Sequence, residues 1–232
     1  DFILNGDDDK LSTVKTVNGK KPVFFGLDAK NDFYAKNIKN SGDGKVLATL
    51  CFDNNNIDVE IPAIGTYMVT NALAAAAAGK LLGLTDEEIA NGVASYKTVG
   101  SRANVINTGK IKIIDDCYNA NPTSVRASLD TLSNLDGRKV AILGDMKELG
   151  SEELKLHFDT GVYAKSKDIG TVITVGELAK ELAKGADGKA FDTIEDAKSE
   201  ILKTIKSGDV VLVKASHSMQ FENIVEFLKQ NF

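Results

Sequence analysis

The second half of the sequence repeats one pattern, in which a short apolar run is followed by a polar loop and then by a helical stretch. Apolar runs occupy residues 112–115, 139–143, 171–175 and 210–214. Stretches of helical periodicity occupy residues 123–134, 151–167, 178–183, 194–206 and 219–230. Strands that alternate with helices pair in parallel, because each helix carries the chain back to the start of the next strand. The pattern therefore predicts an α/β fold with a doubly wound, mainly parallel sheet.

The first hundred residues follow a different pattern. Short apolar runs, such as those at 46–50 and 57–61, are separated by Asn, Asp and Gly clusters, which predicts mostly antiparallel strands and turns. We expect Asn71 to cap an alanine-rich helix that ends at Gly83, and Thr85 to begin a second helix through a capping box with Glu88. Two domains are predicted, at residues 1–102 and 103–232.

Composition limits the class of protein. With 232 residues the chain is long enough for two buried cores, and its net charge of −5 argues against a general nucleic-acid binder, which needs a basic surface. Cys51 and Cys117 lack metal-type spacing, so neither a disulfide framework nor a zinc site is expected and the cytoplasm is the default compartment. The longest apolar run, 72–83, contains Lys80 and is too short to span a bilayer, so no membrane insertion is expected.

The start of the chain and two missing motifs affect the interpretation. The sequence enters an apolar run directly after Asp1, as a fragment of a longer protein would. It contains no G-x-x-x-x-G-K-[ST] phosphate loop, so the chain alone is expected to lack a phosphate cradle. It also contains no G-x-G-x-x-G after a strand, which disfavours a dinucleotide-dependent oxidoreductase.

Polar residues gather after three of the predicted strands, where ligands bind in open parallel sheets. Asp116 follows the first of these strands and could accept hydrogen bonds from ribose hydroxyls, although a turn aspartate would have the same spacing. Asn121 and Pro122 resemble a helix start that leaves N–H groups for an anion, although a plain cap needs no ligand. Lys147 and Lys214 follow the other two strands and could meet a phosphate or carboxylate, although single lysines are more often solvated.

The only two histidines, His157 and His217, are more often structural than catalytic when they stand alone, and no nucleophile–histidine–acid triad can be assembled.

Three ordered strings carry a resemblance to a known family. Residues 115–124 are DDCYNANPTS, residues 143–150 are LGDMKELG with His157 downstream, and residues 213–219 are VKASHSM. They resemble DDSYNANPxS, LGDMxELG…H and VKGSRSM of the Mur ligase family, in the branch that adds D-Ala-D-Ala to UDP-N-acetylmuramoyl tripeptide. Upstream, GTYMVTNALAA at 65–75, GSR at 100–102 and LNGDD at 4–8 are similar to the family's GxHNxxNALAA, PGR and LNADD.

The resemblance covers the whole chain and implies its function. The chain would be the second half of the central ATP-binding domain followed by the complete carboxyl-terminal domain. The UDP-sugar domain, the phosphate loop and the carbamylated lysine that holds magnesium would precede Asp1. The implied reaction uses ATP and Mg²⁺ to form an amide bond through an acyl phosphate, for peptidoglycan synthesis in the cytoplasm. The implied protein is a monomer, and this chain alone would be inactive.

The resemblance also implies roles for individual residues. Those implied for the nucleotide are Tyr67 and Asn71 at the adenine, Arg102 at the phosphates or ribose, Asp116 at the ribose hydroxyls, and Asn119 and Asn121 along the same edge. Those implied for the reacting peptide or the incoming dipeptide are Asp145 and Lys147 as catalytic groups, and Lys214, His217 and Ser218 as substrate-binding groups. No residue of this chain is implied as a metal ligand.

The chain departs from the family strings at five positions. Tyr67 stands where the family has histidine, Met68 replaces asparagine, Cys117 replaces serine, Ala215 replaces glycine and His217 replaces arginine. Tyrosine can still stack on adenine, whereas the change at position 217 removes a permanent bidentate charge. Base binding and carboxylate recognition are therefore where we expect this protein to differ.

Two alternatives stay open. One is a related amide ligase, such as a folylpolyglutamate synthetase or another Mur ligase, which the YNANP string at 118–122 disfavours. The other is a non-catalytic nucleotide-binding module, which an upstream phosphate loop would disfavour. The third residue of the stem peptide, diaminopimelate or lysine, is not determined by this sequence.

Overall fold

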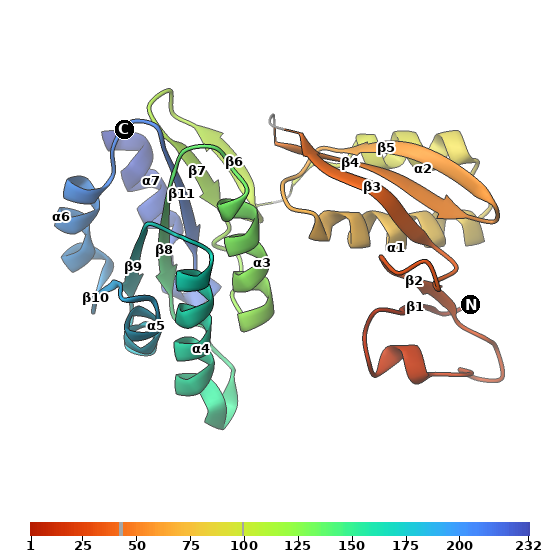
Figure 1. Cartoon of the computed structure of the whole chain (residues 1–232), viewed down its shortest axis with the longest axis horizontal. Coiled ribbons are helices and arrows are strands. Elements are labelled where there is room, and N and C mark those ends of the chain that lie inside the picture. Colours follow the sequence, from red (N-terminus) through yellow and green to blue (C-terminus); the bar gives the residue numbers. More distant parts are fainter. Residues whose placement is uncertain (42–43, 99) are drawn as a thin grey trace. The chain divides into compact units, whose positions relative to one another are not determined.

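The computed structural model describes residues 1–41, 44–98 and 100–232, which form two compact units, Asp1–Lys97 and Thr98–Phe232 (Figure 1). The sequence placed the boundary a few residues later, after Arg102. Backbone hydrogen bonds explain the difference. The Tyr118 N–H donates to the Ser101 carbonyl oxygen at 3.0 Å, and the Ala103 N–H donates to Asp116 Oδ1 at 3.0 Å. Residues just before Ala103 therefore belong with the second unit.

The first unit contains two small sheets. Strands β1 (Ile3–Asn5) and β2 (Val23–Phe25) pair in parallel, with a short 3-10 helix at Leu11–Thr13 between them. Strands β3 (Tyr34–Ser41), β4 (Lys45–Phe52) and β5 (Asn55–Ile61) form an antiparallel sheet. The prediction of mostly antiparallel strands is thus confirmed for β3–β5, whereas β1 and β2 are paired in parallel.

Helices α1 (Tyr67–Leu81) and α2 (Asp86–Ala94) complete the first unit. The prediction that Asn71 caps α1 is wrong, because the helix begins at Tyr67 and Asn71 lies inside it, exposed. The capping box of α2 is confirmed: the Glu88 N–H donates to Thr85 Oγ1 at 3.2 Å and the Thr85 N–H donates to Glu88 Oε2 at 2.8 Å. Both helices pack apolar residues into one core with β4 and β5.

The second unit is built on a six-stranded sheet in the order β10-β9-β8-β11-β7-β6. Its strands are β6 (Asn104–Asn107), β7 (Lys112–Asp115), β8 (Arg138–Gly144), β9 (Thr171–Val175), β10 (Lys189–Phe191) and β11 (Asp209–Lys214). All neighbours pair in parallel except β6, which is antiparallel to β7. The predicted α/β fold with a mainly parallel sheet is confirmed. The sequence missed β6 and β10, because these short edge strands are mostly exposed and lack a continuous apolar run.

Helices cover both faces of this sheet. They are α3 (Pro122–Ser133), α4 (Glu153–Ser166), α5 (Ala179–Ala186), α6 (Ile194–Thr204) and α7 (Glu222–Asn231). Figure 1 shows α3 and α4 on one face and α6 and α7 on the other. The predicted starts of the second and last helices fall instead in 3-10 turns, at Gly150–Glu152 and His217–Met219. No helix in the described part of the chain has the length and apolar character needed to cross a membrane.

The middle of the sheet determines where the polar loops lie. Every residue of β11 is buried, and Val211 and Val213 belong to the core cluster formed with α6 and α7. Each such apolar side chain contributes about 1.5–3 kcal/mol by leaving water. Because β11 lies between β7 and β8 and runs parallel to both, all three strands end at the same edge.

Candidate functional site

Three loops meet at the carboxyl edge of the second unit's sheet. The first loop (residues 116–121) follows β7, the second loop (145–149) follows β8, and the third loop (215–220) follows β11. Each carries one of the strings picked out from the sequence. Because β11 pairs with both β7 and β8, the third loop lies between the other two.

A buried ion pair joins the first loop to the end of β11. The Lys214 ammonium donates to Asp116 Oδ2 at 2.5 Å and to the Asn119 carbonyl oxygen at 2.8 Å. The Lys214 side chain is only 3% exposed. The sequence predicted Lys214 as a substrate-binding group, whereas the structure places its ammonium inside the protein, where it holds the first loop.

Most of the Asp116 carboxylate is already engaged. Besides Lys214, Asp116 accepts hydrogen bonds from the Ser128 hydroxyl at 2.7 Å and from the Ala103 N–H at 3.0 Å. A carboxylate offers about four lone-pair positions, so roughly one remains for a ligand. Asp116 can therefore accept one hydroxyl hydrogen bond without losing a partner inside the protein, but not the two that a ribose could donate.

The two asparagines of the first loop differ in what they leave free. Asn121 caps α3: its Oδ1 accepts from the Ser124 N–H at 2.8 Å, and its own N–H donates to Ser124 Oγ at 3.1 Å. This is the plain cap that the sequence left open as an alternative. Asn119 is exposed, and its Oδ1 accepts from the Ala120 N–H at 2.8 Å. Its amide NH₂ group is the part of this side chain that a ligand could meet.

Cys117, between them, is buried. Its thiol donates to the Val213 carbonyl oxygen at 3.4 Å. Burial, followed by the nearby Asp115 carboxylate, raises the pKa of the Cys117 thiol far above its usual range. A thiol that stays protonated is a poor nucleophile, so Cys117 has a packing role.

The second loop places one acid and one base together. Asp145 is 2% exposed; its Oδ1 accepts from the Ala179 N–H at 2.8 Å and its Oδ2 from the Lys147 ammonium at 2.7 Å. The Lys147 side chain is 43% exposed, so its charge is oriented by Asp145 yet open to an anionic group. Gly176 makes this possible: it has φ +122°, and a Cβ there would lie 2.3 Å from Asp145 Oδ1.

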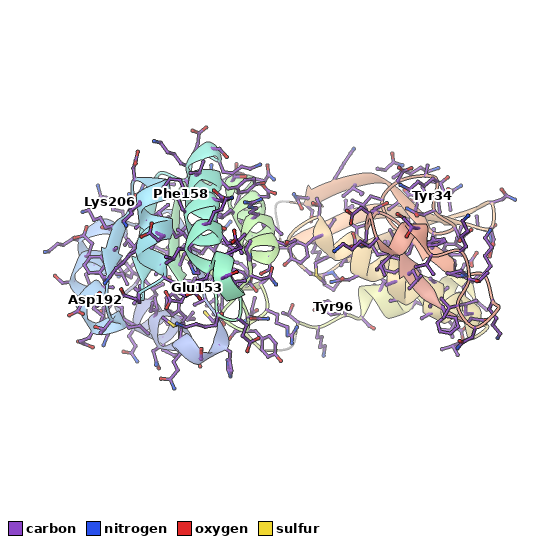
Figure 2. All side chains as sticks on the ribbon, turned by 90° about the horizontal axis from the view of Figure 1, so that it is seen from below. Tyr34, Tyr96, Glu153, Phe158, Asp192 and Lys206 are labelled. Carbon is purple, nitrogen blue, oxygen red and sulfur yellow. The ribbon has the colours of Figure 1, made fainter. Side chains whose placement is uncertain are left out.

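His157 supports the second loop from α4, whose first residue, Glu153, is labelled in Figure 2. The Met146 N–H donates to His157 Nε2 at 2.9 Å, and His157 Nδ1 lies 2.7 Å from the Glu153 carbonyl oxygen. Because an amide N–H only donates, Nε2 must accept and Nδ1 must carry the hydrogen. His157 is 0% exposed, in agreement with the structural role favoured for a lone histidine.

Ser216 ties the second loop to the third. The Lys147 N–H donates to Ser216 Oγ at 2.9 Å, and the Ser216 N–H donates to the Asp145 carbonyl oxygen at 3.1 Å. His217 and Ser218 follow on an exposed 3-10 turn. The three predicted groups Asp145, Lys147 and Lys214 are thus brought to neighbouring positions. The sequence missed two serines: Ser216, which joins the second and third loops, and Ser128, which donates to Asp116.

Above the first loop, Arg102 stacks on an aromatic ring. The Arg102 guanidinium carbon lies 3.5 Å from the centre of the Tyr118 ring, and the His217 ring centre lies 5.9 Å from it. Tyr118 lies within the string at 115–124, but the sequence predicted no role for it. Arg102 and His217, predicted for different ligands, therefore lie on one aromatic residue.

The remaining predicted residues, Tyr67 and Asn71, belong to the first unit. Tyr67 is the first residue of α1, and Asn71 follows one turn later on the same side of the helix. Asn71 also lines a largely apolar cavity of about 320 Å³ between α1 and α2, together with Met68 and with Tyr96, which is labelled in Figure 2. The predicted nucleotide-binding residues are therefore divided between the two units.

No residues suited to a metal are brought together in the described ranges 1–41, 44–98 and 100–232, where no group of three or more His, Cys, Asp or Glu could hold an ion.

Comparison with known proteins gives consistent matches over the whole length. The description "Mur ligase middle domain" matches residues 1–79, and "Mur ligase, glutamate ligase domain" matches residues 101–217. A UDP-N-acetylmuramoyl-tripeptide–D-alanyl-D-alanine ligase of Bacillus subtilis is 33% identical over 98% of this chain, and the chain covers 50% of that protein.

Solved structures agree in fold. The crystal structure of MurF from Acinetobacter baumannii superposes with a TM-score of 0.90 at 28% identity, covering 98% of this chain and 51% of that one. MurF ligase from Thermotoga maritima, solved in complex with ADP, superposes with a TM-score of 0.87 at 26% identity, covering 99% of this chain and 53% of that one. The chain thus spans about half the length of the curated relatives and structures it matches.

Proposed function

Because the chain belongs to the Mur ligase family, we propose that the protein containing it uses ATP to add D-Ala-D-Ala to UDP-N-acetylmuramoyl tripeptide. One observation carries the proposal. The three loops that hold the diagnostic strings meet at one sheet edge and are joined by Lys214 and Ser216. A folded chain that had lost this function would have no need to keep the three strings in contact. We propose the cytoplasm as the compartment and a monomer as the active form.

ATP supplies a phosphoryl group that converts the tripeptide's terminal carboxylate into an acyl phosphate. The amine of D-Ala-D-Ala then forms the amide bond, and phosphate leaves. Catalysis of this kind depends on placing two anions and an amine together and on offsetting their charge.

Lys147 is the group we propose for the offsetting charge. Its ammonium is held 2.7 Å from a buried carboxylate and still faces solvent. Asp145 orients it, while the hydrogen bonds from the Lys147 N–H to Ser216 and from the Met146 N–H to His157 hold the backbone at Lys147 and at the residue before it. A cation with a fixed backbone and an open tip can meet a carboxylate or phosphate with little loss of side-chain entropy.

Nucleotide binding is the role we propose for the first loop. Asp116 keeps about one free acceptor position, which suits a single ribose hydroxyl. The amide of Asn119 is exposed beside it, and Arg102 lies above Tyr118 at the same edge. In the first unit, Tyr67 and Asn71 are proposed for the adenine.

Substrate recognition is proposed for the exposed turn of the third loop. His217 and Ser218 are open to solvent, whereas Lys214 is not. We therefore keep the predicted substrate-binding role for His217 and Ser218 and assign Lys214 instead to positioning of the first loop. A histidine at position 217 offers one or two N–H donors instead of the rigid fork of an arginine, so recognition of a carboxylate there should be weaker.

The test uses the full-length protein encoded by the source gene, with phosphate release followed in the presence of ATP, Mg²⁺, UDP-muramoyl tripeptide and D-Ala-D-Ala. Asp116 is a poor target because its removal would disturb a buried ion pair, so Lys147→Met is the informative variant. Lys155→Met is its matched control: Lys155 also pairs with an aspartate, Asp159 at 2.6 Å, but lies on the surface of α4.

We expect wild-type turnover to require both substrates. In Lys147→Met the kcat should be at least tenfold lower, which corresponds to the loss of about 1.4 kcal/mol of transition-state stabilisation. Lys155→Met should turn over at the wild-type rate. No turnover from a folded, complete wild-type protein would reject the ligase and favour a nucleotide-binding module. Turnover with glutamate in place of D-Ala-D-Ala would favour a related amide ligase.

A further inference from the structure

The contact between Arg102 and Tyr118 is close and lies on the surface. The guanidinium carbon sits 3.5 Å from the ring centre, which is van der Waals contact between two flat groups. Tyr118 is 46% exposed, so the pair is not needed to fill the core. A cation held over an aromatic face is attracted by the ring's quadrupole, and at exposed sites this attraction shifts an equilibrium roughly two- to fivefold.

The backbone on both sides of Arg102 is tied to the same loop. The Ser101 carbonyl oxygen accepts from the Tyr118 N–H, and the Ala103 N–H donates to Asp116 Oδ1, both at 3.0 Å. Ala103 itself has φ +54°, in the left-handed region that non-glycine residues seldom adopt. Such a conformation persists where surrounding contacts impose it. The first loop therefore fixes the main chain of Arg102, and only its side chain keeps rotational freedom.

Tyr118 removes much of that remaining freedom. An arginine side chain loses rotamer entropy when it is ordered, and a ring at contact distance restricts the positions that the guanidinium can occupy. The ring is in turn limited by His217, whose centre lies 5.9 Å away at an interplanar angle of 32°. Arg102 is thus held beside Tyr118 at the sheet edge, as a planar donor of several N–H groups.

We propose that Tyr118 is a positioning residue, which holds the Arg102 guanidinium in the plane in which it binds the phosphate groups of ATP. The inference rests on the proposed function, because it takes Arg102 as a ligand of the nucleotide. Preorganisation of an arginine lowers the entropy lost when it forms paired hydrogen bonds to a phosphate.

A direct role for Tyr118 in stacking on the nucleotide base is the competing explanation. One face of the ring already carries the Arg102 guanidinium at contact distance, so a base could not occupy that face without displacing it. The two explanations differ in which part of the nucleotide the tyrosine affects: phosphates through Arg102, or the base by contact.

The first experiment tests the contact on the chain itself, by NMR of the arginine Nε–H groups. An aromatic ring at this distance moves the Arg102 Nε–H proton upfield. We expect the upfield shift in wild type and in Tyr118→Phe, which keeps the ring, and its loss in Tyr118→Leu. The same Arg102 shift in wild type and in Tyr118→Leu would overturn the proposal without any reference to activity.

The second experiment measures the dissociation constants of ATP and adenosine in the full-length protein. We expect Tyr118→Leu to weaken ATP roughly two- to fivefold and to leave adenosine unchanged, with Tyr118→Phe like wild type. Arg102→Ala should weaken ATP more, roughly ten- to hundredfold, and Tyr118→Leu should add nothing in that background.

Three other outcomes count against the proposal, and a fourth rejects only the ligase function. Equal weakening of ATP and adenosine, or additive effects of the two substitutions, would assign Tyr118 to the base. Failure of Tyr118→Phe to behave as wild type would assign the effect to the hydroxyl. A protein that binds ATP as proposed but forms no amide bond would reject the ligase function and leave the role of Tyr118 intact.

Discussion

The buried pair between Lys214 and Asp116 provides the most direct test of how the site is held together. Replacing Lys214 by methionine keeps the length and apolar stem of the side chain and removes only the ammonium. Asp116 then stays in a largely buried position, with its side chain 12% exposed and its strongest partner gone. The Asn119 carbonyl oxygen loses its donor as well.

The magnitude follows from the burial. Breaking a buried ion pair by removing one partner costs about 3–5 kcal/mol, because the remaining charge is left without compensation. The Ser128 hydroxyl and the Ala103 N–H still donate to Asp116, so we expect the lower half of that range, about 3–4 kcal/mol. Adding Asp116→Asn to Lys214→Met removes the uncompensated charge, and we expect the double variant to be about 1–2 kcal/mol more stable than Lys214→Met alone.

Amide hydrogen exchange in β8 and β11 is the suitable assay. The chain contains two units, so a single melting curve would not report on the second unit alone. Lys165→Met is the matched control, because Lys165 pairs with Asp187 at 2.6 Å and both side chains are mostly exposed. We expect this control to lower the free energy of unfolding by less than about 0.5 kcal/mol. The buried pair would not have the stabilising role assigned to it if Lys214→Met lowered the free energy of unfolding by less than about 1 kcal/mol, or if the effects of Lys214→Met and Asp116→Asn were strictly additive.

Two further expectations follow from the same loops. His157→Phe leaves the Met146 N–H without its acceptor and should destabilise the second unit by about 1–3 kcal/mol, with a larger rise in amide exchange at Met146 and Lys147 than in the rest of the unit. The control Thr160→Val removes a hydrogen bond within α4 only and should show no such local rise. A uniform rise in both variants would contradict the role of His157. The raised pKa of Cys117 favours the protonated thiol in the folded state, so its contribution to stability is present below the ordinary thiol pKa of 9.0 and is lost as the pH rises above it. From pH 9 to pH 10.5 the free energy of unfolding of wild type should fall relative to Cys117→Ala by about 1.6 kcal/mol in all, because the unfolded thiol ionises over this interval. Parallel curves would show that the thiol ionises freely in the folded protein.

The sequence predicted the second unit well because its signals are local. The apolar runs at β7, β8, β9 and β11 are continuous, since these strands are covered by helices on both faces, and they are separated by regular helical stretches. Even the capping residues Asn121 and Thr85 could be assigned, because a cap depends on a residue three positions away and on nothing else.

The errors occurred where a distant contact decides the structure. Asn71 has the residue type of a cap, yet α1 begins one turn earlier, because Met68 and Val69 are buried in the core of the first unit. Strands β1 and β2 are only three residues long, ILN and VFF, and such short runs carry no signal for the direction in which they pair. The domain boundary lies before Arg102 because two backbone hydrogen bonds to the first loop bind the neighbouring residues to the second unit.

Lys214 shows why the chemistry of the site was harder to predict than its location. Spacing placed both Lys147 and Lys214 next to the end of a buried strand, and so predicted the same anion-binding role for both. Their difference depends on the carboxylate each one meets. The partner of Lys147 is Asp145, two residues away on the same loop, which leaves the ammonium at the surface. The partners of Lys214 lie on the first loop, almost a hundred residues earlier, and draw the ammonium inward. Two lysines with the same local sequence signal thus have opposite exposures, one fit to meet a substrate and the other to hold the loop that meets it.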